Sequence, residues 1–287
     1  MPDGDDRRRA HGYVHAPADW KLLSERRVLG FVTELTFRRP DGSVVRWSSR
    51  AHRKRGRAPV SGSTWWAPRA LAWWIGVLFI MGSACFAIGP LPAYASRAGL
   101  TADTATFFTG SLFFTAAAFL QYIEVAVTPH SIDRTAAPVV RPRLLLGIEP
   151  SRVDWWAATV QLIGTLFFNV TTFAAFLQNL DARQQRRIVW TPDALGSVCF
   201  LVASWLAYAE AGHRVISWLP HRRSWWIAAL NLVGSIAFGV SAVASFVRPA
   251  TGDYVSLFLT NLGTFVGAVC FAAGAVLLLP ERTHPDG

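Results

Sequence analysis

Residues 70–89 read ALAWWIGVLFIMGSACFAIG, an apolar stretch without a single charged residue and with a tryptophan pair, Trp73-Trp74, near its start. A helix rises about 1.5 Å per residue, so this stretch is long enough to cross the roughly 30 Å of hydrocarbon in a bilayer. An uncharged apolar run of this length is typical of a transmembrane helix. It predicts that the chain enters a membrane here, and the sequence on its C-terminal side has the same character.

Six apolar stretches of this kind predict an all-α membrane protein with six transmembrane helices. Hydrophobic residues make up 52% of the chain and charged residues only 16%, below the quarter that is usual in soluble proteins. The predicted spans lie near residues 70–89, 104–127, 155–177, 192–212, 225–247 and 254–279. We therefore expect a transmembrane domain over residues 65–281, preceded by a small N-terminal segment.

An internal repeat groups the six spans into three hairpins of two helices. The odd-numbered spans open with Trp73-Trp74, Trp155-Trp156 and Trp225-Trp226, and eight residues after each pair stands a glycine followed by Ser or Thr. The even-numbered spans carry a glycine followed by Ser or Ala. Four residues after each of these glycines stands a phenylalanine: Phe86, Phe114, Phe168, Phe200, Phe238 and Phe271. Small residues allow close helix packing, so the repeat predicts three hairpins around a pseudo-threefold axis along the membrane normal.

Each even-numbered span also carries a glutamate fourteen residues after its glycine: Glu124, Glu210 and Glu281. Fourteen residues are about four helical turns, so glycine and glutamate share one helix face. Basic residues precede the tryptophan pairs at the same membrane level: Arg69, Arg152, Arg222 and Arg223. We expect these arginines to pair with the glutamates within or between hairpins. The alternative is a ring of acids at the mouth of a path, as in cation-selective pores.

The distribution of Lys and Arg predicts that both termini lie in the cytoplasm. The side with the two termini and residues 128–154 and 213–224 holds 23 of these residues, whereas the opposite loops hold 5. The first 30 residues contain no apolar run, so we expect no secretory signal peptide. Arg outnumbers Lys 26 to 2, which hints at a GC-rich bacterial genome and hence at the bacterial inner (plasma) membrane.

The N-terminal segment divides into a tail expected to be disordered, residues 1–18, and a cytoplasmic part, residues 19–64. Within the latter, residues 31–48 alternate in strand fashion around Pro40-Asp41-Gly42, which predicts a β-hairpin. A lone hairpin is marginally stable, so residues 19–57 are expected to rest on the membrane domain or on a protein partner.

A basic run follows the hairpin and contains Arg50, Arg53, Lys54, Arg55 and Arg57. Its composition suits contact with anionic lipid headgroups, although an ordinary positively charged flank of the first span would have the same composition. Residues 1–69 carry a net charge of +8, and beside a membrane domain we expect this charge to face lipid rather than nucleic acid.

Polar side chains inside the spans are few. Gln161 and Asn231 hold equivalent positions, five residues after the second tryptophan of their repeats, and Asn169 and Asn261 complete the group. Such amides commonly form hydrogen bonds between helices, and the alternative is that they line a path for a solute or an ion.

Signals for catalysis in the sequence are poor. It contains no Ser-His-Asp arrangement, no phosphate-binding glycine loop and no metalloprotease motif, and its acids lie in loops and at helix ends. Cys85, Cys199 and Cys270 lie in apolar runs without Cys-x-x-Cys spacing. We therefore expect no catalytic residues, no metal and no cofactor.

The hairpin unit resembles the YrhK-like family of small bacterial membrane domains. The likeness rests on Thr106-Phe107-Phe108-Thr109-Gly110-Ser111-Leu112-Phe113-Phe114 and on the equivalent Gly-Ser segment at 196–200. Members of that family have two helices, the second with a Phe-x-x-Gly-Ser-type stretch that ends in a charged residue. The resemblance covers the hairpins but not residues 1–64, and it implies neither an activity nor catalytic residues.

Two functions fit these features. The first is a non-catalytic membrane scaffold or interaction protein, whose N-terminal segment engages lipid or a protein partner. The second is a small transporter or channel, with a path along the pseudo-threefold axis. The absence of a charged residue near the middle of the spans favours the first.

Overall fold

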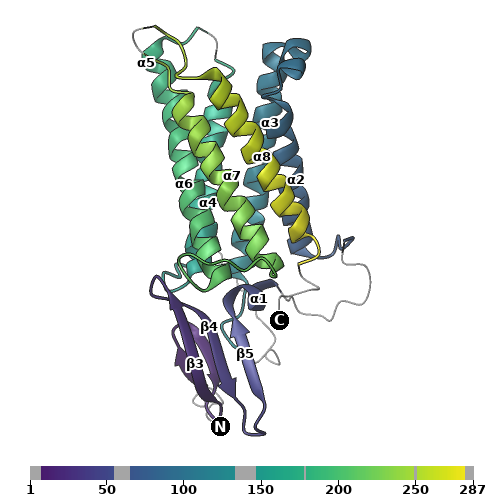
Figure 1. The fold of residues 1–287 in the computed structure, drawn as a ribbon, viewed down its shortest axis with the longest axis vertical. Helices are drawn as coiled ribbons and strands as arrows, with labels where there is room; N and C mark the ends of the chain where they lie inside the picture. The colour runs from purple at the N-terminus through teal and green to yellow at the C-terminus, as the bar shows by residue number, and fades with distance from the viewer. Residues whose placement is uncertain (1–7, 55–64, 133–146, 178, 249–250, 282–287) are drawn as a thin grey trace.

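The computed structural model describes residues 8–54, 65–132, 147–177, 179–248 and 251–281. Six long helices form a bundle, and a small β-sheet domain lies at one of its ends (Figure 1). The long helices are α2 (Leu71–Ile88), α3 (Pro92–Ala126), α4 (Val153–Ala174), α6 (Thr191–Gly212), α7 (Arg223–Ala244) and α8 (Leu257–Leu278). All six are long and apolar enough to cross a membrane, so the chain is a multi-pass membrane protein.

The predicted spans agree with these helices apart from the start of the second. α3 begins at Pro92, twelve residues before the predicted residue 104, and Gly99 interrupts its helical backbone with a φ of 76°. Residues 92–103 include Arg97 and Asp103, so they lack the apolar character that marks a span although they form helix. α6 also has an extension, because α5 (Ala182–Gln184) and the π-helix η2 (Gln185–Trp190) lead directly into it.

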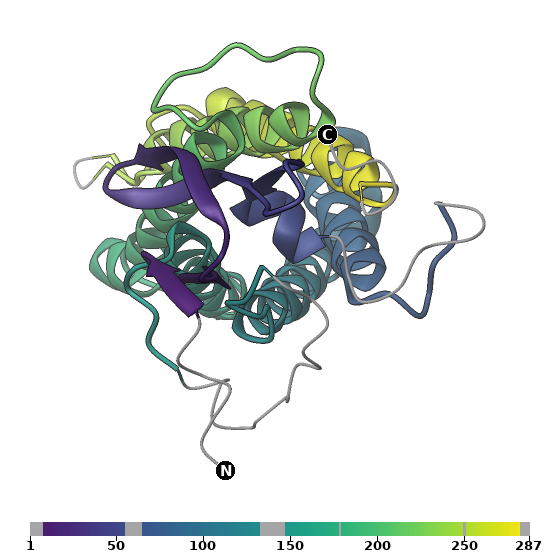
Figure 2. The same ribbon diagram turned by 90° about the horizontal axis from the view of Figure 1, so that it is seen from below.

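The six helices form a closed ring made of three antiparallel hairpins. The hairpins are α2–α3, α4–α6 and α7–α8, and each also packs against the next, with α8 returning to α2 (Figure 2). Within each hairpin two glycines bring the backbones together. A Cβ atom added to Gly196 would lie 3.1 Å from the carbonyl oxygen of Gly164, and one added to Gly267 would lie 3.0 Å from that of Gly234. The hairpin α2–α3 has the same contact between Gly82 and Gly110, at 2.9 Å.

One phenylalanine from each long helix points to the centre of the ring, and together the six form what we call the phenylalanine layer: Phe86, Phe114, Phe168, Phe200, Phe238 and Phe271. Rings within a hairpin lie 5.5, 5.0 and 5.6 Å apart, measured between centroids. Rings of different hairpins lie 5.7–6.2 Å apart, in T-shaped or tilted arrangements. Aromatic pairs at such distances attract each other beyond their burial, so the layer fastens the three hairpins to one another.

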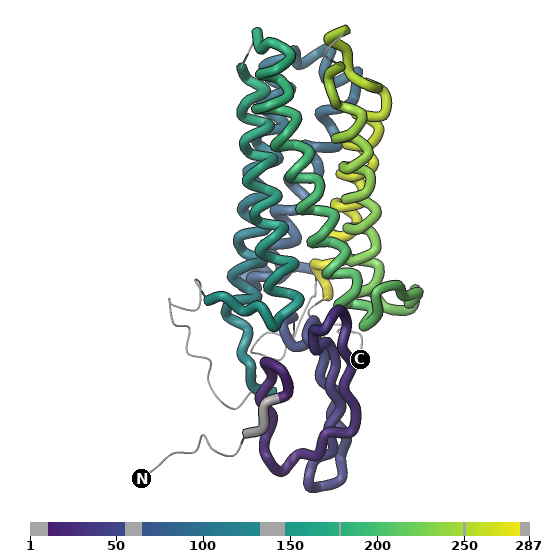
Figure 3. Tube along the Cα trace, turned by 90° about the vertical axis from the view of Figure 1, so that its left-hand side faces the viewer, coloured from purple at the N-terminus to yellow at the C-terminus, as the bar shows by residue number. Residues whose placement is uncertain are grey.

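The N-terminal domain, which lies below the helix bundle in Figure 3, consists of a two-stranded and a three-stranded antiparallel sheet. β1 (Arg8–His11) pairs with β2 (Val14–Pro17), and β4 (Phe31–Arg38) lies between β3 (Lys21–Val28) and β5 (Val44–Ser48). The hairpin predicted around Pro40-Asp41-Gly42 is confirmed as β4–β5, and Asp41 accepts a hydrogen bond from the backbone of Ser43 in its turn.

The expected disorder of residues 1–18 is wrong for residues 8–18, while residues 1–7 lie outside the described chain. Val14 and Ala16 of β2 are almost fully buried against Leu35, Phe37 and Trp47 of the three-stranded sheet. These few apolar residues, set among charged neighbours, supply the core that orders the strands.

Candidate functional site

The site lies at the end of the bundle next to the sheet domain, which we call the α1 end. β5 runs without a break into the short helix α1 (Ser49–Lys54), and α1 lies across the opening of the helix ring (Figure 2). Arg50, Arg53 and Lys54 are spaced i, i+3 and i+4, so they project from one face of α1. All three side chains are buried inside the protein.

Each of these cations meets a glutamate from a different hairpin. Lys54 Nζ lies 2.7 Å from Glu124 of α3, and Arg53 Nη2 lies 3.0 Å from Glu210 of α6. Arg50 donates two hydrogen bonds to Glu281, which follows α8. We call Glu124, Glu210 and Glu281 the acidic ring. Three copies of one position in the repeat thus converge on a single six-residue helix.

The glutamates thus have partners that were not predicted, and the predicted pairing is wrong for Arg69, Arg152 and Arg222. Arg69 is exposed, Arg222 is half-buried near His213, and α7 begins at Arg223, whereas the acidic ring binds α1. Arg152 is buried, but it pairs with Asp154 and Glu149. Arg69 lies at the periphery of the bundle, where the second tryptophan of each pair is exposed, whereas Arg152 is buried beside Asp154 and the glutamates face the axis.

The predicted contact with anionic lipid is also wrong for Arg50, Arg53 and Lys54. Their charged groups lie inside the bundle opening and bind carboxylates, so they do not reach a headgroup layer. Arg55 and Arg57 lie outside the described residues.

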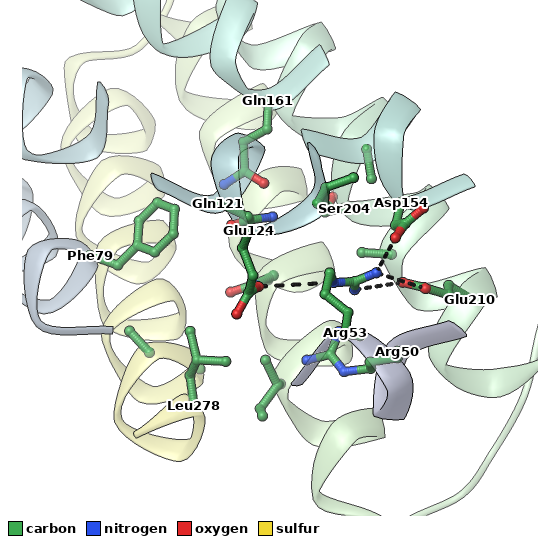
Figure 4. Close-up of a pocket in the computed structure, with 18 of the residues that line it drawn as sticks. Arg50, Arg53, Phe79, Gln121, Glu124, Asp154, Gln161, Ser204, Glu210 and Leu278 are labelled. Carbon is green, nitrogen blue, oxygen red and sulfur yellow. Dashed lines mark hydrogen bonds and ion pairs between the residues drawn. The ribbon is translucent and has the colours of Figure 1, made fainter. Parts of the chain in front are cut away.

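Asp154 adds a fourth carboxylate to the site. It is the second residue of α4 and binds Arg53 Nη1 at 2.7 Å and Arg152 Nη2 at 2.8 Å. Figure 4 shows Arg53 pointing between Glu124, Asp154 and Glu210. Arg50, Arg53, Lys54 and Arg152 thus balance four buried acids.

The surroundings of these groups keep them ionised. Burial alone would lower the pKa of Arg53, but the charges of Glu210 and Asp154 outweigh burial and raise it well above its ordinary value. Burial alone would raise the pKa of Glu281, but the charges of Arg50 and Lys54 lower it below its ordinary value. Arg53 and Glu281 are therefore charged members of their ion pairs.

A cavity lined by both polar and apolar side chains lies between α1 and the phenylalanine layer, and we call it the axial cavity. Its empty space, including the part that opens to solvent, is about 800 Å³, and residues from all six long helices or their flanks and from α1 line it. The centres of water molecules can occupy about 60 Å³ of it, whereas one water needs about 10–15 Å³. Gln121, Gln161, Ser204 and Asn231 supply polar groups, so the axial cavity suits several waters or a small hydrated solute.

The predicted polar residues divide into two groups. Gln161 and Asn231 both line the axial cavity, and within the described chain neither side chain has a hydrogen-bond partner from another helix. Asn169 lies nearer the opposite end of the bundle, and its amide donates to Thr115 Oγ1 at 2.9 Å, as expected of an interhelical contact. Asn261 is half-buried near the start of α8, away from the cavity.

The phenylalanine layer closes the axial cavity on its other side. Phe200 and Phe271 line the cavity, and Phe200 also lines a small pocket within the layer. The pocket offers about 10 Å³ to the centres of water molecules, at the limit for a single water, and apart from Ser111 its lining is entirely phenylalanine. An apolar space of this size stays dry, so no continuous file of water crosses the bundle in this structure.

The sheet domain also contacts α6 directly. Glu34 of β4 accepts hydrogen bonds from Arg46, and its carboxylate lies 3.4 Å from Nε2 of His213, the residue that caps α6. Burial, together with the charges of Arg222 and Arg46, lowers the pKa of His213 more than the charges of Glu34 and Glu210 raise it. A neutral histidine thus lies between the sheet and the acidic ring.

A proline precedes each tryptophan pair at a constant distance, and this pattern was not identified from the sequence. The indole nitrogens of Trp74, Trp156 and Trp226 each donate to the carbonyl oxygen of a proline six residues earlier: Pro68, Pro150 and Pro220. The constant spacing of these prolines in all three repeats could have revealed the contact. The i, i+3, i+4 spacing of Arg50, Arg53 and Lys54 was a comparable signal for a helix with one charged face.

No protein-family model, no curated protein and no solved structure matches this chain.

Proposed function

We propose that the protein conducts or carries small cations along the axis of the three hairpins. The observation that carries this proposal is the axial cavity, which lies on the bundle axis and ends at four carboxylates. A scaffold protein that transported nothing would be more stable if the centre of its helix bundle were filled with apolar side chains. Here Gln161 and Asn231 instead face open space at equivalent positions of two hairpins.

The charges at the mouth favour cations over anions. Without α1, the described part of the bundle contributes the four acids Glu124, Asp154, Glu210 and Glu281, which are only partly offset by Arg152 at Asp154 and by Arg222, which lines a pocket beside Glu210 and Glu281. Rings of acids at a pore mouth concentrate cations and repel anions. The amides of the cavity can replace part of the hydration shell of a cation, because each offers a carbonyl oxygen.

The test is flux through purified protein in liposomes, measured with proton-, potassium- and anion-sensitive dyes. We expect cation flux in the wild type and its loss in the double variant Gln161→Leu/Asn231→Leu. Asn261→Leu is the matched control, because Asn261 lies outside the cavity, and it should conduct like the wild type. Anion flux without cation flux, or undiminished flux in the double variant, would refute the proposal.

The setting of this function is part of the proposal. The α1 end faces the cytoplasm of a bacterial cell and the bundle spans its plasma membrane, in keeping with the excess of Lys and Arg on that side. The hairpins are three copies of one unit of the YrhK-like type, which agrees with their matching glycine and phenylalanine contacts. No enzymatic activity is proposed.

A second candidate is the scaffold or interaction protein, and the outer strand of the sheet favours it. β3 is an edge strand, and Leu23, Ser24, Glu25, Arg26 and Arg27 are exposed in succession. An open strand edge can pair with a strand of a partner protein. If none of the tested ions crosses the membrane and Leu23→Lys abolishes the function of the protein in cells, the scaffold proposal replaces the transport proposal.

A further inference from the structure

Helix α1 is attached to the bundle almost entirely by charge. Its sequence, Ser49-Arg50-Ala51-His52-Arg53-Lys54, contains one apolar side chain, and that side chain is only a methyl group. The contacts that hold it in the opening include the ion pairs to the acidic ring and to Asp154, a hydrogen bond from Ser49 to Glu210 at 2.7 Å, and a polar contact of 3.0 Å between His52 Nε2 and the carbonyl oxygen of Pro129. This contact buries little apolar surface, and the burial of apolar surface is what usually holds a helix firmly in place.

A helix of this length has no stability of its own. Isolated helices shorter than about 12–15 residues are marginal in water, so α1 keeps its form through its contacts. Charged groups released from a protein regain their hydration, and this gain offsets much of the attraction lost when the ion pairs break. The bound and released states of α1 are therefore closer in free energy than the number of ion pairs suggests.

We infer that α1 is an autoinhibitory plug, which closes the axial cavity at the α1 end by occupying the acidic ring with its own cations. Its withdrawal opens the cavity and exposes the acids to a cation from solution. The inference rests on the proposed function for what passes through the opening, but the closing contact itself is independent of transport.

The sheet domain is the element that can move the plug. Ser48 ends β5 and Ser49 begins α1, so no linker separates the sheet from the plug. The sheet is held to the rest of the protein by polar contacts, such as those of Glu34 with His213 and of His15 with the backbone of His130 and Ile132, and by a small apolar contact of Phe31 with α4 and α6. A partner or a change of charge that displaces the sheet would draw α1 out with it.

The plug is tested by the accessibility of the cavity to a thiol reagent. Ser204, which lines the cavity and is buried, is replaced by Cys after Cys85, Cys199 and Cys270 have been changed to Ala. The full chain in liposomes is treated with a charged, membrane-impermeant methanethiosulfonate. The rate of modification reports how often α1 leaves the opening, whether or not any ion crosses the membrane.

The informative variant is Arg53→Gln/Lys54→Gln, which removes the cations that bind Glu124, Asp154 and Glu210. Its matched control is Lys21→Gln/Arg38→Gln, with the same change of net charge at exposed positions of the sheet. Breaking buried ion pairs should raise the modification rate about 100-fold, whereas the control should keep the wild-type rate. An unchanged rate in a variant that remains folded by circular dichroism would overturn the plug.

A charge exchange separates the plug from a general defect in folding. Lys54→Glu places a like charge against Glu124 and should accelerate modification. Adding Glu124→Lys restores an opposite pair at the same place and should return the rate toward that of the wild type. Failure of the exchange to slow the reaction would count against the ion pairs as the closing contact.

Flux in the same liposomes distinguishes the two proposals. If modification and cation flux rise together in Arg53→Gln/Lys54→Gln, both proposals stand. If modification accelerates and no ion passes, the plug stands and the transport function fails.

Discussion

Replacement of Phe200 by Ala tests whether the phenylalanine layer is the barrier on the axis. Phe200 is 2% exposed, and its ring centroid lies 5.0 Å from that of Phe168, 5.7 Å from that of Phe271 and 6.1 Å from that of Phe114. It also lines both the axial cavity and the small pocket within the layer. Removal of its ring therefore joins the two spaces.

The cost of this change follows from the burial of the ring. Phe→Ala in a packed core costs about 3–5 kcal/mol, part from lost apolar burial and part from the cavity that remains. The site is held on three sides by other rings and on the fourth by Gly164, whose added Cβ would lie 2.9 Å from Phe200 Cδ2. Because the surrounding helices are already in contact, they have little room to collapse, and we expect the upper part of this range.

Two measurements follow, thermal unfolding in detergent and cation flux in liposomes. Phe173→Ala is the matched control, since Phe173 is 59% exposed on the outer face of α4 and its loss should cost about 1 kcal/mol or less. We expect Phe200→Ala to lower the unfolding temperature well below that of Phe173→Ala. It should also raise flux above the wild type, because an apolar constriction that excludes water is a barrier to ions.

The result that would refute the barrier is a Phe200→Ala protein that is destabilised as expected but conducts like the wild type. The layer would then be a packing element only, and the barrier would lie elsewhere. Equal unfolding temperatures for the two variants would contradict the packing itself.

Two further changes test the packing and the sheet contact. Gly234→Ala places a Cβ 2.7 Å from a ring carbon of Phe271, whereas the Cβ of Gly239→Ala on the same helix meets nothing within 4 Å. We expect the Gly234→Ala protein to be less stable than the Gly239→Ala protein by about 1–3 kcal/mol in thermal unfolding. Equal stabilities would contradict the close approach of the two helices. Because burial lowers the pKa of His213 from 6.5, the unfolded chain binds a proton at this residue more readily than the folded chain, so the stability of the folded state should fall as the pH drops below about 6.5. His213→Gln should flatten this dependence in tryptophan fluorescence, and an unchanged pH profile would exclude His213 as its source.

The architecture of the membrane domain was readable from the sequence because the bilayer imposes strict length and polarity on each span. Five of the six predicted spans begin and end within three residues of the helices in the structure. The start of α3 could not be found in this way, because residues 92–103 form helix without being apolar. Hydropathy identifies what can lie in hydrocarbon, not where a helix begins.

The acidic ring was predicted as a set of positions, but its partners were not. The periodicity of the repeat places Glu124, Glu210 and Glu281 on the packed face of their helices, and this face is on the axis of the bundle. The choice of partner depends on which basic residues reach the axis, and this depends on the tertiary position of α1. The basic composition of Arg50, Arg53 and Lys54 fits lipid headgroups and carboxylates equally well, so composition alone could not decide.

The structure shows why the three glutamates of the acidic ring and the three cations of α1 occur together. An acid near the C-terminal end of a helix meets an unfavourable dipole, and three of them around one axis also repel one another. Of the arginines in the tryptophan flanks, Arg152 reaches this cluster through Asp154, whereas the three glutamates take their cations from α1. A single-copy helix from outside the repeat satisfies all three acids at once. When α1 is bound, its three cations neutralise the three glutamates at the opening of the bundle. When α1 is displaced, the same opening becomes strongly acidic.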